Sequence, residues 1–123
     1  METDLLTQKV IGCAISVHKE LGPGLLESSY EHCLNYELNL QGIVVQRQVM
    51  LPVRYKSITV DAGYRLDLLI ENNLIVELKA VDKLSNIHLA QMMTYLKLTG
   101  IKRGLIINFN VTKLVSGIKR VSL

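Results

Sequence analysis

Two acids and a lysine stand inside otherwise apolar stretches of this sequence. Asp67 lies within residues 64–70, and Glu77 and Lys79 lie within residues 74–80. A charged side chain in a buried strand is costly unless it is paired or binds a metal. Glu77 and Lys79 are two residues apart, so in a strand they project from the same face. The pattern indicates a polar site built into a sheet.

Phosphodiester hydrolysis is the chemistry that these three residue types suit. Asp67 and Glu77 offer hard oxygen donors that can hold one or two Mg²⁺ or Mn²⁺ ions. Such an ion lowers the pKa of a bound water and neutralises charge at the scissile phosphate. Lys79 can orient or activate that water, or stabilise the pentavalent phosphate. The alternative is a solvated sheet face on which Asp67 forms a salt bridge.

The turn between the two strands sets a condition on this hypothesis. A two-residue turn would place Asp67 and Glu77 on opposite faces of the sheet. A three-residue turn that pairs Ile70 with Leu74 places the two acids directly opposite each other, and a bulge would also serve. We therefore predict a three-residue turn or a bulge near residues 72–73.

The elements that must position these residues follow from hydrophobic periodicity and turn signals. We expect Tyr30, Leu34 and Leu38 on the inner face of the second helix, and Pro52 at a sheet edge or a bulge. The sequence predicts one mixed α/β domain over residues 1–123, with a central sheet flanked by helices. The predicted helices cover residues 4–21, 25–40 and 85–99, and the predicted strands cover residues 43–55, 58–71, 74–80, 104–109 and 113–121.

Length and composition narrow the class of protein. With 123 residues, 49% of them hydrophobic, the chain suits one domain with a modest core. We expect no membrane segment, since no apolar run reaches roughly 18 residues. The acidic start differs from a secretory signal, so a cytoplasmic protein is expected. Cys13 and Cys33 cannot build a four-thiolate zinc or iron–sulfur site, and we interpret both as core residues without a disulfide.

Charge is distributed unevenly along the chain. Residues 79–123 contain eight Lys or Arg residues and one acid, Asp82, whereas residues 1–78 contain six bases and ten acids. A basic C-terminal third suits a polyanion such as nucleic acid. A solubilising surface would give the same pattern.

Four short motifs follow one another along the chain: Gly24-Leu25-Leu26-Glu27-Ser28-Ser29-Tyr30, Tyr64-Arg65-Leu66-Asp67, Glu77-Leu78-Lys79 and Gln91-Met92-Met93-Thr94-Tyr95. With them the chain resembles the RecB-like branch of the PD-(D/E)xK nucleases, with its D…ExK…QxxxY series, and the small GxxExxY protein family placed in that superfamily. The likeness extends from the first helix to residue 120.

The resemblance implies an αβββαβ restriction-endonuclease-like core and a role for each motif residue. Asp67 and Glu77 would be metal ligands and Lys79 the catalytic lysine. Glu27 would complete the metal site from a helix, directly or through water, so the three carboxylates should converge. Gln91 would border the site and position the lysine or the substrate.

Other residues near these motifs have two interpretations each. Glu27 stands in the first turn of a helix, where a carboxylate also suits the helix dipole. Tyr95 and Tyr30 are candidates for substrate contact, but either can be a core residue. His88 can touch a substrate phosphate or be an ordinary surface histidine. Arg65 can bind phosphate or pair with an acid.

The chain also departs from the superfamily pattern. Leu66 replaces the proline of the superfamily's name, and the cysteines for an iron–sulfur cluster are missing. No substrate-gripping insertion is evident, so a homo-oligomer or a partner would supply further nucleic-acid surface. The sequence favours a Mg²⁺- or Mn²⁺-dependent nuclease acting on DNA. The alternatives are a non-cleaving nucleic-acid-binding or regulatory module that keeps the fold, and a plain structural α/β protein.

Overall fold

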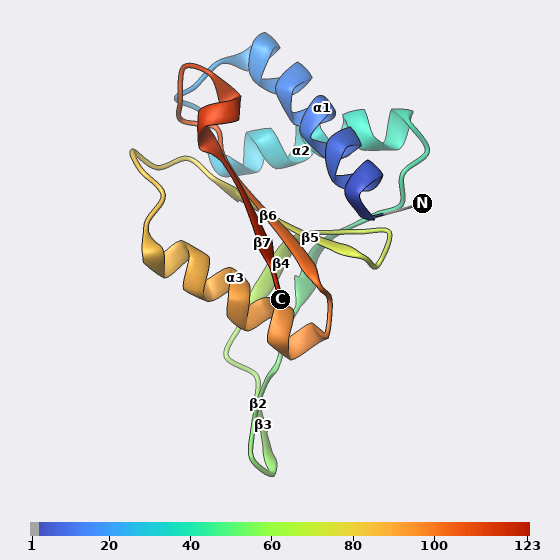
Figure 1. The fold of residues 1–123 in the computed structure, drawn as a ribbon, viewed down its shortest axis with the longest axis vertical. Helices are drawn as coiled ribbons and strands as arrows, with labels where there is room; N and C mark the ends of the chain where they lie inside the picture. Colours follow the sequence, from blue (N-terminus) through green and yellow to red (C-terminus); the bar gives the residue numbers. More distant parts are fainter. Residues whose placement is uncertain (1–2) are drawn as a thin grey trace.

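The order of helices and strands follows the predicted one. The computed structural model describes residues 3–123 (Figure 1). Helix α2 and helix α3 begin and end within two residues of the predicted positions. The elements are α1 (Thr3–Leu21), α2 (Glu27–Leu40), β1 (Val45–Met50), β2 (Val53–Tyr55), β3 (Ile58–Val60), β4 (Arg65–Ile70), β5 (Leu74–Lys79), α3 (Asn86–Thr99), β6 (Arg103–Asn108), the 3₁₀ helix η1 (Leu114–Gly117) and β7 (Ile118–Ser122).

A mixed sheet forms the centre of the fold. Within residues 3–123 it has five strands in the order β1-β4-β5-β6-β7. Neighbouring strands are antiparallel except β5 and β6, which are parallel. Helix α3 makes the crossover that a parallel pair requires. The predicted mixed α/β fold with a central mixed sheet is confirmed.

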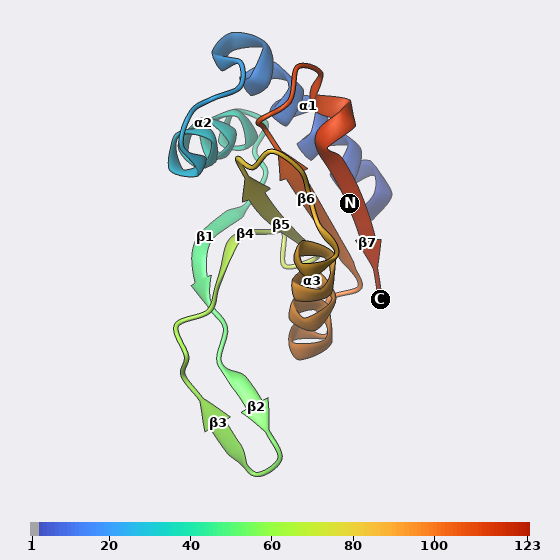
Figure 2. The ribbon, with the colours of Figure 1, turned by 90° about the vertical axis from the view of Figure 1, so that its left-hand side faces the viewer.

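Helices cover both faces of the sheet. Helices α1 and α2 lie together on one side and α3 lies on the other (Figure 2). Strand β5 shows why, because Leu74, Val76 and Leu78 belong to the core under α1 and α2, whereas Ile75 belongs to the core under α3. Because side chains alternate along a strand, the apolar residues of β5 point to both sides, and the strand is buried on both faces.

The two predicted long strands are each broken, which corrects the sequence prediction. Residues 43–55 form β1 and β2, and residues 58–71 form β3 and β4. The break on one side falls at Pro52, which has no amide hydrogen for the ladder, and on the other side near Gly63, whose φ is +79°. At the break, the Leu51 amide still donates to the Tyr64 carbonyl at 2.9 Å.

Strands β2 and β3 form a separate two-stranded sheet beyond the break. This hairpin projects away from the body of the protein, on the side opposite α1 and α2 (Figures 1 and 2). We call residues 53–60 the arm.

Smaller predictions were confirmed or revised. Ser85 precedes α3 and Gly100 ends it with a left-handed φ of +76°, as predicted. The predicted last strand begins later, because residues 114–117 form a 3₁₀ turn. Cys13 is buried and Cys33 half-buried, and neither forms a disulfide. Among the described helices none combines the length and apolar character needed to span a bilayer.

Candidate active site

The turn between β4 and β5 fixes how the candidate acids face each other. Ile70 pairs with Leu74, so three residues lie between the paired positions, as predicted. Glu71 and Asn72 have left-handed φ values of +51° and +54°, and the Asn73 amide donates to the Ile70 carbonyl at 2.9 Å. The same register, continued along both strands, places Asp67 opposite Glu77.

The ladder between β4 and β5 opens at this point. Its last pair is Leu68 with Val76. Beyond it, the amide of Asp67 donates to Oε1 of Glu77 at 3.0 Å, and the amide of Leu78 donates to Oδ2 of Asp67 at 2.8 Å. Each carboxylate thus accepts a hydrogen bond from a backbone amide that would donate to a backbone carbonyl in a regular ladder.

The other neighbour of β4 is interrupted at the same position. Strand β1 pairs with β4 on both sides of Asp67, but Gln48, which the register would place opposite Asp67, is unpaired. Gln48 has a left-handed φ of +52°, which is rare for a residue other than glycine. Asp67 therefore sits where the sheet is open on both sides.

Burial changes the proton affinity of both acids. Glu77 is 6% exposed. Desolvation, together with the nearby charge of Asp67, raises the pKa of Glu77 from its ordinary 4.5 to about 8. Burial also raises the pKa of Asp67, although the hydrogen bond from Leu78 opposes this. With a pKa of about 8, the Glu77 carboxyl is mostly protonated at neutral pH when no cation is bound.

Glu27 approaches the same edge of β5 from α2. It is the first residue of that helix, and its Oε2 accepts a hydrogen bond from the Ala80 amide at 3.1 Å. The Leu78 and Ala80 amides are two residues apart, so they lie about 7 Å from each other along the strand. Asp67 and Glu27 therefore accept hydrogen bonds from two amides on the same edge of β5 that are two residues apart. The expected convergence of Glu27, Asp67 and Glu77 is therefore not seen, since within the described residues no three His, Cys, Asp or Glu side chains are close enough to hold a metal ion together.

Lys79 follows Glu77 on the same face of β5 and is half-buried. Its charge lowers the pKa of both Asp67 and Glu77, so it acts on the acid pair directly. Lys79 also pairs with Asn108 of β6. The Asn108 side chain accepts from the Val81 amide and donates to its carbonyl, at 3.1 and 2.9 Å, and so fixes the chain just after the lysine.

A groove beside Asp67 contains residues that the sequence did not single out. The groove has a volume of about 420 Å³ and lies between α2, β1 and β4. Glu31, one helical turn after Glu27, is 7% exposed and accepts from Arg47 at 3.1 Å and from Gln48 at 2.6 Å. Its charge contributes to the raised pKa of Asp67. The four-residue spacing of the two glutamates was visible in the sequence.

The predicted residues of α3 have different surroundings. Tyr95 is buried, and burial together with the charges of Glu77 and Asp67 raises its pKa to about 12. Gln91 is half-buried one turn earlier on the helix. Nδ1 of His88 accepts a hydrogen bond from the Ser85 amide at 3.1 Å, so this histidine caps the start of the helix. Tyr95 is thus close to the acid pair, and His88 has a structural contact of its own.

Two further predicted residues lie at the margins of the site. Tyr30 is fully buried, and its ring stacks on Phe109 with centroids 4.3 Å apart. Its hydroxyl donates to the Gly22 carbonyl at 2.6 Å and accepts from the Leu25 amide at 3.1 Å, which fits the core interpretation and fixes the loop before Glu27. Arg65 is exposed at the start of β4.

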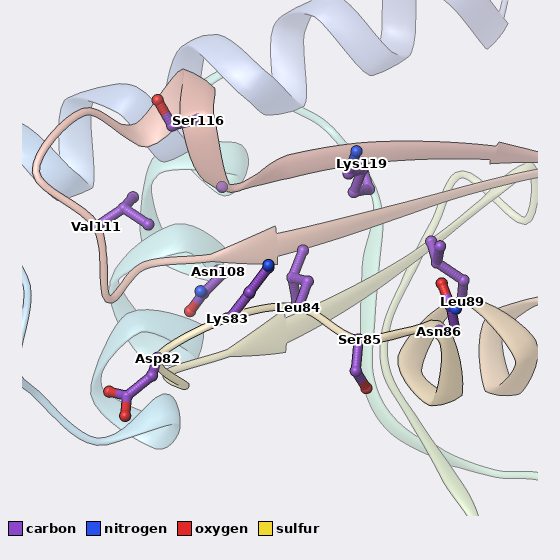
Figure 3. Close-up of a pocket in the computed structure, with 11 residues that line it drawn as sticks. Asp82, Lys83, Leu84, Ser85, Asn86, Leu89, Asn108, Val111, Ser116 and Lys119 are labelled. Carbon is purple, nitrogen blue, oxygen red and sulfur yellow. The ribbon is translucent and has the colours of Figure 1, made fainter.

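A second cavity, of about 330 Å³, lies between the loop before α3 and the strands β6 and β7 (Figure 3). Asp82 and Lys83 of the loop, Asn108 at the end of β6 and Lys119 of β7 line it. It contains a single carboxylate, so it lacks the acid pair that distinguishes the groove at Asp67.

The five-stranded mixed sheet with its three helices is consistent with the restriction-endonuclease-like fold. The sequence profile of the PD-(D/E)XK nuclease superfamily matches residues 4–121. The chain belongs to this superfamily, which implies a nucleic-acid substrate. Comparison with curated proteins gives no significant match, and comparison with solved structures gives none either.

Proposed function

We propose that this protein is a metal-dependent nuclease that hydrolyses phosphodiester bonds in DNA. One observation carries the proposal: the half-buried Asp67 and the buried Glu77 face each other where the β4–β5 ladder opens. Leaving two carboxylates in such a place is unfavourable unless a cation joins them.

The donor set fits a hard divalent cation. Asp67 and Glu77 would hold Mg²⁺ or Mn²⁺, and Glu27 would bind directly or through a water. Mg²⁺ sites in proteins commonly use one or two carboxylates and keep several waters, so two acids suffice. When bound, the ion supplies a water of lowered pKa and positive charge at the scissile phosphate.

Lys79 and α3 complete the proposed machinery. Lys79 orients or activates the attacking water, or stabilises the charge that develops on the phosphate. Gln91 positions the lysine or the substrate. Tyr95, with its pKa raised to about 12, keeps its proton at neutral pH and can donate a hydrogen bond to substrate. Arg65 is exposed and available to a phosphate, and His88 is a weaker candidate because its ring caps α3.

DNA is proposed as the substrate because of the superfamily and the charge. The matched superfamily is one of nucleases, and residues 79–123 carry the excess of Lys and Arg. A homo-oligomer would enlarge the nucleic-acid surface of so small a domain.

A cleavage assay tests this proposal. Single- and double-stranded DNA and RNA would be incubated with the protein in Mg²⁺, Mn²⁺ or EDTA. We expect metal-dependent cleavage that is lost in Lys79→Ala and in Asp67→Ala. Lys9→Ala and Glu20→Ala are matched controls, since both residues are exposed on α1, outside the basic residues 79–123, and they should cleave normally. Activity that survives both site substitutions would refute the mechanism.

A second candidate function is a nucleic-acid-binding or regulatory module that does not cleave. It is favoured by the separation of the three carboxylates, since within residues 3–123 no three acids are grouped as a metal site. Nucleic-acid binding without cleavage in either metal would support it over the nuclease.

A further inference from the structure

Among residues 3–123, the arm is the part of the fold that extends beyond the central sheet and its helices (Figure 2). We propose that it binds a single strand of nucleic acid and leads that strand to the acid pair. This inference rests on the proposed nuclease function and names the form of its substrate. It also supplies the gripping element that the sequence did not reveal.

The arm has one apolar and one polar face. Val53 pairs with Val60 and Tyr55 pairs with Ile58, and since side chains alternate along a strand, these four share a face. The opposite face carries the pair of Arg54 with Thr59.

The apolar face is open to solvent. Tyr55 is 60% exposed and Ile58 is 55% exposed. A two-stranded hairpin is at best marginally stable in water without further burial of its apolar side chains. The apolar face can therefore bind a ligand that buries it. The residue types of the arm indicate the kind of ligand.

Charge selects a polyanion. Residues 1–78 contain six bases and ten acids, yet four of those six bases lie within residues 47–65, where Asp61 is the one acid. These bases are Arg47, Arg54, Lys56 and Arg65; Arg47 is already paired with Glu31, which leaves the other three for a ligand. A basic segment of this kind attracts the phosphate groups of nucleic acid. It would repel the same basic segment of a second copy of the chain.

Side-chain chemistry selects unpaired bases. Proteins that hold single strands combine cations along the backbone with aromatic surfaces on which bases stack. Tyr55 and Tyr64 are exposed aromatic residues of this region, and Nζ of Lys56 lies 5.4 Å from the Tyr55 ring centroid. Reading a duplex groove requires hydrogen-bonding side chains instead, and Val53, Ile58 and Val60 offer none.

The arm is continuous with the candidate site. Tyr64 and Arg65 lie at its base, and Asp67 follows two residues later on β4. The Tyr64 carbonyl accepts a hydrogen bond from the Leu51 amide at 2.9 Å, which ties the base of the arm to the end of β1. Exposed aromatic and basic residues thus run from the tip of the arm to the acid pair.

The turn of the arm keeps a lysine where glycine would be favoured. Lys56 has a left-handed φ of +53°. Glycine adopts this conformation at no steric cost. Lys56→Gly therefore removes a charge without weakening the hairpin, which makes it a useful variant.

Binding is measured in EDTA by fluorescence anisotropy, with a labelled oligothymidine strand of about twenty nucleotides, so that cleavage plays no part. We expect Tyr55→Ala to weaken binding at least about fivefold. Arg54→Gln combined with Lys56→Gly should reduce the slope of log affinity against log salt by about 1.4, the value for two lost phosphate contacts on a single strand. Melting curves check that each variant is folded.

The controls match the substitutions in type. Tyr36 is 62% exposed on α2, and Lys9 and Lys19 are exposed on α1. Tyr36→Ala and the double variant Lys9→Gln, Lys19→Gln should leave affinity and slope unchanged.

Three results would overturn the inference: arm variants that bind like the wild type, an equal loss of affinity for a duplex of the same length, or a dimer in sedimentation that Tyr55→Ala dissociates while strand affinity is kept. The outcome is separable from that of the nuclease proposal. A protein that binds through the arm but cleaves nothing contradicts the nuclease proposal alone, and one that cleaves while arm variants bind normally contradicts the arm alone.

Discussion

Glu77 should destabilise the metal-free protein at neutral pH. The difference in the free energy of unfolding between the wild type and Glu77→Gln should measure this effect. The pKa of Glu77 rises from 4.5 in an exposed setting to about 8 in the fold. The folded state therefore holds a proton that the unfolded state has released. The stability linked to this proton is complete below about pH 4.5 and is lost as the pH rises toward 8.

The size of the effect follows from the shift. Each pH unit within this window costs about 1.4 kcal/mol, so between about pH 5.5 and 7.5 the wild type should lose about 2–3 kcal/mol through this group. Glu77→Gln is neutral at every pH, and its amide oxygen can still accept the hydrogen bond from Asp67. We expect it to be more stable than the wild type by about 2–4 kcal/mol near pH 7.5 in EDTA, or on the order of 10 °C in Tm.

Thermal unfolding in EDTA at several pH values measures this difference. Glu20→Gln, at the exposed end of α1, is the control for loss of a surface carboxylate. Added Mn²⁺ should narrow or close this difference, because it stabilises the wild type by about 2.7 kcal/mol at a hundredfold excess over Kd while leaving Glu77→Gln unchanged. If Glu77→Gln proved no more stable than the wild type near pH 7.5, and the two curves had the same pH dependence, the claim of a desolvated acid pair would be wrong.

Two other predictions concern the residues that pack around the site, and both are measured as changes in Tm in the same assay. Tyr30→Phe removes both hydroxyl hydrogen bonds to the loop before α2 and should cost about 1 kcal/mol; no loss of stability would contradict the structural role of that hydroxyl. Gly117→Ala should cost more than Gly104→Ala, because the added methyl group meets the backbone carbonyl of Asn108 in the first case and the flexible side chain of Met92 in the second. Equal costs would contradict the packing at the end of β6.

The register of the site was predictable because chemistry restricted it. Asp67 and Glu77 share a site only if the turn has three residues or a bulge, and Asn72 tolerates the left-handed backbone that such a turn needs. Local sequence permitted that turn, and the requirement for two adjacent acids selected it. The motif from Gly24 to Tyr30 likewise brought Glu27 to the same strand edge.

Neither the arm nor the groove could be predicted from the sequence, and the reasons differ. Residues 43–55 are rich in Val, Ile, Leu and Tyr, as one strand would be. Whether a hairpin stays in the sheet depends on neighbours far along the chain. Pro52 marked the break without showing that the outer part would leave the sheet. Glu31 could have been found from its spacing to Glu27, whereas nothing in the sequence announces the left-handed backbone of Gln48.

Anomalous diffraction from crystals soaked in Mn²⁺ tests the central claim most directly, because it locates the ion itself. The account predicts a peak in contact with carboxylate oxygens of Asp67 and Glu77, with Glu27 bound directly or through a water, and its loss in Asp67→Ala. A peak elsewhere on the molecule, or none at a Mn²⁺ concentration that supports cleavage, would contradict it.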